Sequence, residues 1–413
     1  MAYVQYITHN GLSEPLGRSQ VLPYIRGLAR RGHVFRVFSF EPPGSARPKP
    51  GDVPGTHSFH IRKKGTGLLS KIRDFLNGMD GVSFGREVDL IHCRGYLPTA
   101  MGMFARAHTV QAGSAGGEPS LPKIIFDMRG FLPQEYLDAG HWKVTDFRYL
   151  VAKLFEARFL TCADGIVVLT SRARESLLEW YDNTGRPPPP IEVIPCCVDM
   201  NLFKRDEAAG NAVRRKLGFV GPVMVYSGSL GSWYMAREMA QAYAFLRKKT
   251  PSLCFLALTQ SSAEPLKKEL SAFRVLDDRV KITQCDYQDV PAYLSAADLG
   301  ISFIQPAPSK AASSPTKIAE YLSCGLPVLA NSGVGDLDDQ ARGFPHIHLL
   351  QDLSEQSLKE FAVEFRWDAV MSESTRAACC GFARTRFDLE EVGVELYHAF
   401  YKKLLGTEVI GDE

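Results

Sequence analysis

Apolar residues in this chain fall into short runs that alternate with amphipathic segments. YVQYIT and HVFRVFSF read as strands, and NGLSEPLGRS between them is a turn-rich loop. Residues 19–32 carry apolar side chains at helical spacing, and Gly32 is suited to end that helix. This order predicts a βαβ opening and a parallel sheet with helices on both faces.

The alternation continues to the end of the chain. VDLIHCRG, KIIFDMRG, DGIVVLT and IEVIPCCVD follow in the first half, and VMVYSG, LCFLAL, VKITQ, LGISFI and LPVLAN in the second. Helices are predicted after these runs at residues 233–249, 264–273, 290–297 and 316–323. We expect an α/β fold of two Rossmann-like domains joined near residues 197–215. The predicted parts are residues 1–200, residues 201–385 and a final helical stretch at residues 386–413.

Composition narrows the class of protein. The 413 residues are enough for two or three domains, and 48 Lys and Arg against 46 Asp and Glu give a net charge of +2. That balance argues against nucleic acid as a partner. The nine cysteines form no CxxC pair and lie mostly in apolar runs, which favours reduced thiols over a zinc site. No signal peptide and no apolar run of about 18 residues is found, so a cytoplasmic protein is expected.

The segment SSPTKIAEYLSCGLPVLA predicts a short helix with clear ends. Ser314 is a good N-cap, Pro315 suits the first helical position, and Gly325 suits the position after the last turn. Because this helix follows the strand LGISFI, its N-terminus should lie at the carboxyl edge of the sheet, where open α/β sheets bind ligands.

Phosphate is the ligand that this helix start favours. The amides of Thr316 and Lys317 and the helix dipole attract an anion, and the Lys317 ammonium adds a full charge. Glu320 lies on the same helical face, which suits the ribose hydroxyls of a nucleotide-sugar. The alternative is an ordinary surface pair at a helix end.

Two glycine-containing loops follow predicted strands. Gly11 and Gly17 flank the first, which precedes a helix whose N-terminal amides could hold an anion, and Gly228 opens the second, GSLGSW. Either is also compatible with an ordinary βα turn. Neither contains GxGxxG, which argues against an NAD-dependent oxidoreductase.

SPTKIAEYLSCGLPVLAN resembles the donor-binding signature of retaining GT-B glycosyltransferases of family 4. VIPCCVDMNLF is similar to the interdomain stretch of that family, and GLSEPLGRSQVLPYIRGLARRGH to its N-terminal loop and first helix. DVPAYLSAADLGISFI resembles the helix and strand before the donor helix. Together these segments span nearly the whole chain.

The resemblance implies two Rossmann-like domains, with the acceptor on the N-terminal side and the nucleotide-sugar donor on the C-terminal side. It also implies that a final helix at Leu389 to Leu405 crosses back to the N-terminal domain. No cofactor and no metal ion is expected. The implied acceptor is a glycan or a lipid-linked sugar, in the assembly of bacterial surface polysaccharide or glycolipid.

The resemblance also assigns roles to residues. The catalytic candidates are Asp127, His92, Arg94 and Lys317, and Arg129 and Arg18 are placed on the acceptor side. Donor binding is expected from Gly17, Gly228, Ser229, Arg237, Ser314, Pro315, Thr316, Lys317 and Glu320.

This chain departs from the family pattern at three points. Asp127, in FDMRG, stands where many members carry a His after an N-terminal strand. Ala312 stands where the family often has a first Glu, and the loop GSLGSWYMAREM supplies no Arg and Lys pair, which leaves the diphosphate to Lys317 with Arg237 nearby.

Alternatives stay open at this point. Asp127 could be a structural carboxylate paired with Arg129, and His92 a packed core residue. IRKKGTGLLSKIRDFLNGM, at residues 61–79, fits either a basic helix on its own domain or peripheral contact with an anionic membrane. The rival functions are a catalytically silent sugar-binding relative and a nucleotide-sugar epimerase.

Overall fold

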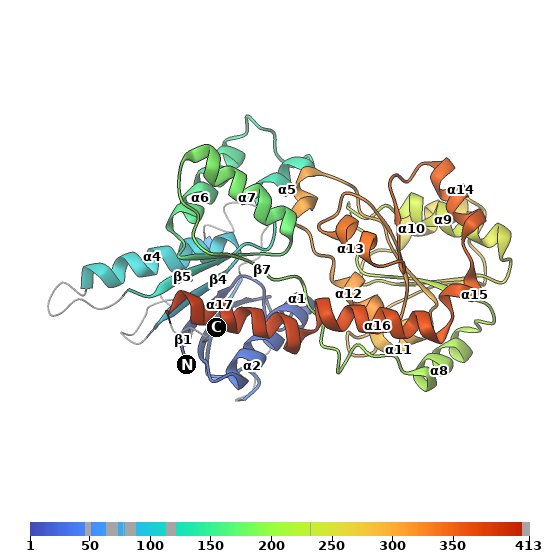
Figure 1. Ribbon diagram of the computed structural model, residues 1–413, viewed down its shortest axis with the longest axis horizontal. Helices are drawn as coiled ribbons and strands as arrows, with labels where there is room; N and C mark the ends of the chain where they lie inside the picture. Colours follow the sequence, from blue (N-terminus) through green and yellow to red (C-terminus); the bar gives the residue numbers. More distant parts are fainter. Residues whose placement is uncertain are drawn as a thin grey trace, which may run out of the picture. The chain divides into compact units, whose positions relative to one another are not determined.

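The computed structural model describes residues 1–45, 51–62, 73–76, 78, 88–112, 121–231 and 233–406, with the backbone alone at residues 108–112. It divides into two compact units, Met1–Pro195 with Leu389–Glu413, and Cys196–Asp388 (Figure 1). The boundaries predicted from the sequence are residues 200 and 385. Most of the basic stretch at residues 61–79 lies outside the described residues. No described helix has both the length and the hydrophobicity needed to cross a membrane.

The described residues of the N-terminal unit form a parallel sheet in the order β3-β2-β1-β4-β5-β6-β7. Helices α4, α6 and α7 cover one face of this sheet, and α1, α2 and α17 lie on the other (Figure 1). The strands are β1 Tyr3–Thr8, β2 Val34–Glu41, β3 Thr56–Ile61, β4 Leu90–Arg94, β5 Lys123–Asp127, β6 Gly165–Val168 and β7 Ile191–Val193. The helices are α1 Pro15–Gln20, α2 Leu22–Arg30, α4 Tyr96–Ala112, α5 Leu132–Asp138, α6 Phe147–Cys162, α7 Ser171–Thr184, the π-helical turn η3 Leu389–Val394 and α17 Glu395–Leu404.

The second unit is also built on a parallel sheet, in the order β10-β9-β8-β11-β12-β13. Its strands are buried on both faces, because Val223 and Val225 of β8 pack into one core while Met224 and Tyr226 pack into the other. The strands are β8 Val223–Ser227, β9 Cys254–Leu258, β10 Val280–Thr283, β11 Leu299–Ser302, β12 Val328–Asn331 and β13 Ile347–Leu350. The helices are α8 Glu207–Leu217, α9 Ala236–Lys249, α10 Glu264–Ala272, α11 Val290–Ser295, η2 Pro308–Ala312, α12 Thr316–Ser323, α13 Leu337–Gly343, α14 Glu355–Glu364, α15 Trp367–Val370 and α16 Glu373–Phe387.

The first helical segment differs from its prediction. The single helix expected over residues 19–32 is two helices, α1 and α2, separated at Val21, whose φ of −127° is not helical. Pro23 explains the break, because it has no amide hydrogen to donate to the preceding turn. Gly32 does follow the last turn, with a φ of +88°, and His33 N–H donates to Leu28 at 3.2 Å in a Schellman closure.

The end of the chain returns to the N-terminal unit. A Cβ on Gly27 of α2 would lie 2.4 Å from Val394, and one on Gly165 of β6 would lie 2.7 Å from Phe400. Both glycines therefore let backbone and helix approach closely. Ion pairs between Arg30 and Glu390 and between Arg31 and Glu395 border the same contact.

Asp298 ties four segments of the second unit together from a position that is 3% exposed. Its carboxylate accepts from Val223 N–H at 2.9 Å and from Arg376 at 2.8 Å, and it pairs with Arg214. Arg376 is itself buried, so loss of the anion would leave an uncompensated charge in the interior.

Replacement of Asp298 by Ala is expected to cost about 3–5 kcal/mol in the free energy of unfolding, measured by urea denaturation. Asp368→Ala is the matched control, because its ion pair with Arg366 is exposed and screened by solvent and should contribute little to stability. Equal effects of the two substitutions would contradict the role given to Asp298.

Candidate functional site

The helix α12 begins where β11 has ended, at the carboxyl edge of the second sheet. Its N-cap is Pro315 and not Ser314, which corrects the prediction by one residue. The Ser314 hydroxyl instead accepts from the Cys196 amide at 3.1 Å. Since Pro315 offers no side-chain cap, the first amides of the helix, at Thr316 and Lys317, have no partner within it.

Lys317 lies at this helix start and is only 5% exposed. Its Nζ donates to the Tyr226 hydroxyl at 3.2 Å and lies 4.3 Å from the centre of that ring and 3.9 Å from the Tyr234 ring. Burial lowers the pKa of Lys317 to about 7, against an opposing effect of Glu320. Aromatic faces therefore hold the ammonium in place without neutralising it.

Glu320 is one turn further along α12 and is 9% exposed. Burial raises its pKa to about 7, and Lys317 opposes the shift. Among the described residues, no ion pair within 4 Å joins Glu320 to a cation. A buried cation and a buried carboxylate with so little compensation are typical of a ligand site.

Gly228 follows β8 and lies directly against the lysine. Its φ is +138°, and a Cβ there would lie 2.8 Å from Lys317 Nζ, so a side chain would be strained and would also displace the ammonium. The next residue, Ser229, is exposed, and its carbonyl accepts from Tyr226. Arg237 is exposed on the first turn of α9, which starts three residues later than predicted.

The N-terminal glycine loop does not fit the predicted anion site. The Leu12 amide donates to Glu41 at 2.7 Å, the Ser13 amide to the same carboxylate at 3.2 Å, and the Gly11 amide to Glu14 at 2.7 Å. The loop therefore already holds carboxylates of the chain itself. Gly17 serves close packing, because a Cβ there would lie 1.9 Å from the Gly11 carbonyl oxygen, and Arg18 is exposed on α1.

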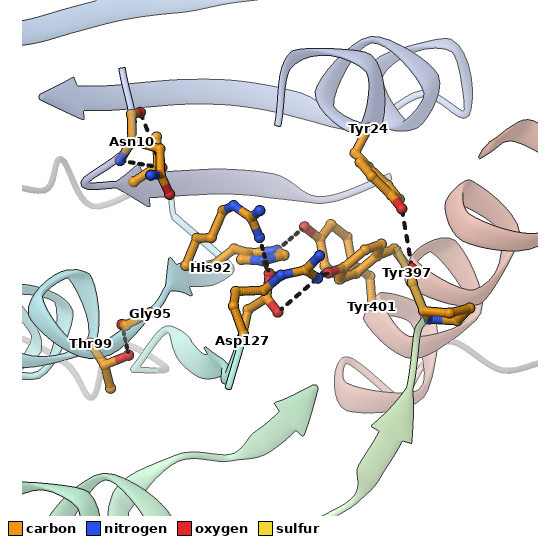
Figure 2. Close-up of polar contacts among 12 residues, drawn as sticks. Asn10, Tyr24, His92, Gly95, Thr99, Asp127, Tyr397 and Tyr401 are labelled. Carbon is orange, nitrogen blue, oxygen red and sulfur yellow. Dashed lines mark hydrogen bonds and ion pairs between the residues drawn. The ribbon is translucent and has the colours of Figure 1, made fainter. Parts of the chain in front are cut away.

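The carboxyl ends of β4 and β5 bring four of the predicted residues together (Figure 2). Asp127 is the centre: His92 Nε2 lies 3.3 Å from one carboxylate oxygen, Arg94 3.6 Å from the same oxygen, and Arg129 3.4 Å from the other. Both Asp127 and His92 are at most 1% exposed.

Two tyrosines of α17 complete this cluster, and sequence reasoning missed them. Tyr397 donates to Asp127 at 3.1 Å and accepts from Arg129 at 3.4 Å, while the Tyr401 hydroxyl lies 2.6 Å from His92 Nδ1 (Figure 2). The available signal was the i,i+4 spacing of Tyr397 and Tyr401, which places them on one face of the amphipathic helix.

The charges in the cluster follow from burial and pairing. Burial would raise the pKa of Asp127, but Arg129, the His92 hydrogen bond and Arg94 outweigh it and hold the pKa well below its usual range. Burial lowers the pKa of His92, against the effect of Asp127. At neutral pH the cluster thus contains one carboxylate, two guanidinium groups and a neutral imidazole.

This geometry favours a structural role for Asp127 and His92 over direct catalysis. Both oxygens of Asp127 are engaged, and both ring nitrogens of His92 have partners, so neither side chain has a free group to offer to a substrate. Arg129, whose side chain is 15% exposed, is the member that reaches the surface most.

Comparison with known proteins places the fold. Residues 17–197 match the family described as a glycosyl transferase 4-like domain. Sucrose-phosphate synthase from Thermosynechococcus elongatus superposes with a TM-score of 0.68 at 16% identity, covering 99% of this chain and 100% of that chain. Anabaena HepE, solved with UDP-glucose, gives 0.66 at 17% identity and covers 97% and 99% of the two chains.

A third solved structure, WaaG, a glycosyltransferase involved in lipopolysaccharide biosynthesis, gives a TM-score of 0.64 at 15% identity and covers 98% and 100% of the two chains. No curated protein matches the sequence significantly. Since the structural matches extend over both units, they confirm the predicted GT-B fold class.

Asp127→Asn should test the role of the cluster. The substitution removes the negative charge between Arg94 and Arg129, so we expect a loss of about 3–5 kcal/mol in the free energy of unfolding and faster hydrogen exchange in α17. Tyr401→Phe, which removes one hydrogen bond, should cost about 1 kcal/mol. An Asp127→Asn protein with unchanged stability would point to a catalytic carboxylate instead.

Proposed function

Because the chain is a glycosyltransferase with the GT-B fold and a glycosyl transferase 4-like domain, we propose that it transfers a sugar from a nucleotide-sugar to a hydroxyl acceptor. The transfer retains the anomeric configuration and needs no metal ion. The observation that carries this proposal is the buried Lys317 ammonium beside Gly228, at the start of α12, where Pro315 and Thr316 are partly exposed.

Each group around Lys317 has a role in binding the donor. Lys317 Nζ and the free amides of α12 hold the diphosphate, because a helix N-terminus and a desolvated cation both favour a bound anion. The absence of a side chain at Gly228 lets the diphosphate approach the ammonium. Glu320 accepts from the ribose hydroxyls. HepE, a protein of the same fold, was solved with UDP-glucose, which supports a nucleotide-sugar donor here.

The chemistry then depends on holding the charge that develops as the donor breaks. The bond from the anomeric carbon to the phosphate oxygen breaks, the acceptor oxygen bonds to that carbon on the same face, and the departing phosphate oxygen takes the hydroxyl proton. Lys317 and the helix amides stabilise the leaving diphosphate. This route requires no side-chain base, which agrees with the engaged Asp127 and His92.

The remaining assignments follow from this route. Asp127, His92 and Arg94 are positioning residues, and Arg129 is the member of that cluster placed to meet the acceptor. We expect a glycan or a lipid-linked acceptor, in surface polysaccharide or glycolipid assembly, and a cytoplasmic enzyme. Lys317 carries the positive charge that a divalent cation would otherwise supply.

One observation favours a second candidate function. Ala312 is 2% exposed and apolar where the resemblance expects a carboxylate toward the sugar. A protein that binds the nucleotide-sugar without transferring it would tolerate this change.

A thermal-shift screen of nucleotides and nucleotide-sugars identifies the donor, because a ligand specific for the native state raises the melting temperature. Transfer assays with that donor then separate the two functions.

Lys317→Met is expected to reduce kcat/KM for transfer by about a hundredfold or more, because the leaving diphosphate loses its cation. The control is Lys268→Met, which removes an exposed lysine from the same unit and should leave kcat/KM unchanged. Product formation is followed by chromatography from subsaturating to saturating donor, which gives both kcat and kcat/KM. Normal turnover in Lys317→Met would rule out the assigned role.

Donor affinity should also depend on pH. The protonated lysine binds the diphosphate, and its pKa is about 7 in the free protein, so binding above that pH must take up a proton. The dissociation constant is therefore expected to rise with pH, approaching about tenfold per unit between about pH 7 and pH 9.

Calorimetric titration with the nucleotide-sugar measures how the dissociation constant changes with pH in the unmodified chain, in Lys317→Met and in Glu320→Gln. The rise with pH should disappear in Lys317→Met. In Glu320→Gln the dissociation constant should still rise with pH, but the rise should begin at a lower pH. The reason is that the Glu320 carboxylate raises the pKa of Lys317, and its removal lowers that pKa. A slope of equal size in Lys317→Met would assign the proton to another group.

A further inference from the structure

Helix α6 has an apolar surface that its own unit does not cover. Phe147 is 72% exposed, Leu150 49%, Leu154 70% and Phe155 52%, and Val144 just before the helix is 61% exposed. We call these five residues the α6 face. Single exposed apolar residues are common on proteins, whereas a contiguous group of this size marks an interaction surface.

The face is continuous along the helix. Phe147, Leu150 and Leu154 follow one another at intervals of three and four residues, which places them in one stripe. The opposite side of the same helix is also apolar and packs into the unit through Phe159 and Leu160. The helix thus has one apolar side that packs in its own unit and a second apolar side that is exposed.

The charges that border the α6 face are cationic. Arg148 and Lys153 lie on the two flanks of the stripe, Arg158 lies on it one turn beyond Leu154, and Lys143 precedes Val144. The single acid of α6 is Glu156, which is 6% exposed and is bonded to Tyr96 and Lys153 beneath the helix.

Asp146, directly before α6, caps the helix and pairs with Arg148. Arg148 and Lys153 are therefore paired, and the outer side of α6 combines large apolar side chains with two exposed cations, Lys143 and Arg158, for which the described residues supply no ion pair.

We propose that the α6 face docks on an anionic lipid surface, with the helix parallel to the bilayer. The apolar side chains enter the boundary between headgroups and acyl chains, and the lysine and arginine heads reach the lipid phosphates. A second copy of the chain fits less well, because two cationic faces would then meet. This inference does not depend on the proposed function; with it, docking brings the enzyme to lipid-linked acceptors.

Flotation with vesicles of phosphatidylcholine, with and without phosphatidylglycerol, tests the proposal. We expect the full chain to bind the anionic vesicles and to be released by salt. The double variant Phe147→Ser with Leu154→Ser should bind the anionic vesicles at least about tenfold more weakly. Its control is Val220→Ser with Val363→Ser, which removes two exposed valines, at 96% and 72%, from the other unit.

A second pair of variants tests the charge. Lys143→Glu with Arg158→Glu should lose the preference for anionic vesicles, whereas Lys216→Glu with Lys268→Glu, on exposed positions of the other unit, should keep it. Melting temperatures establish that each variant is folded, and the charge pair decides the question if the serine pair does not fold.

Three outcomes would overturn the proposal. The first is that the unmodified chain does not bind anionic vesicles. The second is that binding is unchanged in both the serine and the charge variants. The third is a dimer in sedimentation that the serine pair abolishes, which would assign the α6 face to a second copy of the chain.

Discussion

The proposed donor site depends on one constraint, the desolvation of the Lys317 ammonium. Two tyrosine rings hold it at about 4 Å, and a glycine with positive φ leaves room above it. Burial without a close carboxylate lowers the pKa of this lysine, so the group gains most by receiving an anion. Tyr226 is central to this arrangement, because it accepts from Lys317 and donates to the Ser229 carbonyl in the adjacent loop.

The N-terminal unit uses buried charge in a different way. Its cluster at the ends of β4 and β5 is closed by hydrogen bonds from α17, a helix that lies more than two hundred and fifty residues away in sequence from Asp127. In this cluster the buried carboxylate of Asp127 is compensated by Arg94 and Arg129, whereas the buried ammonium of Lys317 has no ion-pair partner within 4 Å among the described residues. This contrast is the reason for proposing different roles for the two groups, positioning for Asp127 and His92 and diphosphate binding for Lys317.

Features with local causes were predictable from the sequence. The two strand-and-helix series, the bounds of α12 and the Gly325 closure, with its φ of +75°, follow from apolar periodicity and glycine chemistry. Proximity of Arg94 and Asp127 followed from their places at neighbouring strand ends. The resemblance of SPTKIAEYLSCGLPVLAN to the family-4 signature identified the fold class.

Features that depend on distant partners were not predictable. Glu41 fills the loop at Leu12 from a strand end 29 residues away, and nothing in the local sequence indicates this. The sequence around Ser314 is typical of a helix N-cap. Its hydroxyl nevertheless accepts a hydrogen bond from the amide of Cys196, 118 residues earlier. The α6 face was also missed, because periodicity cannot distinguish an apolar side that packs on the core from one that is left exposed.

Whether Lys317 is a desolvated ammonium that receives an anion is tested most directly by its own pKa. NMR of side-chain-labelled lysine measures this pKa, and Lys317→Arg assigns the signal. We expect a pKa of about 7 in the free protein and a rise toward the ordinary 10.5 on saturation with the nucleotide-sugar donor. A pKa near the ordinary 10.5 in the free protein, or one that the donor does not change, would contradict this expectation.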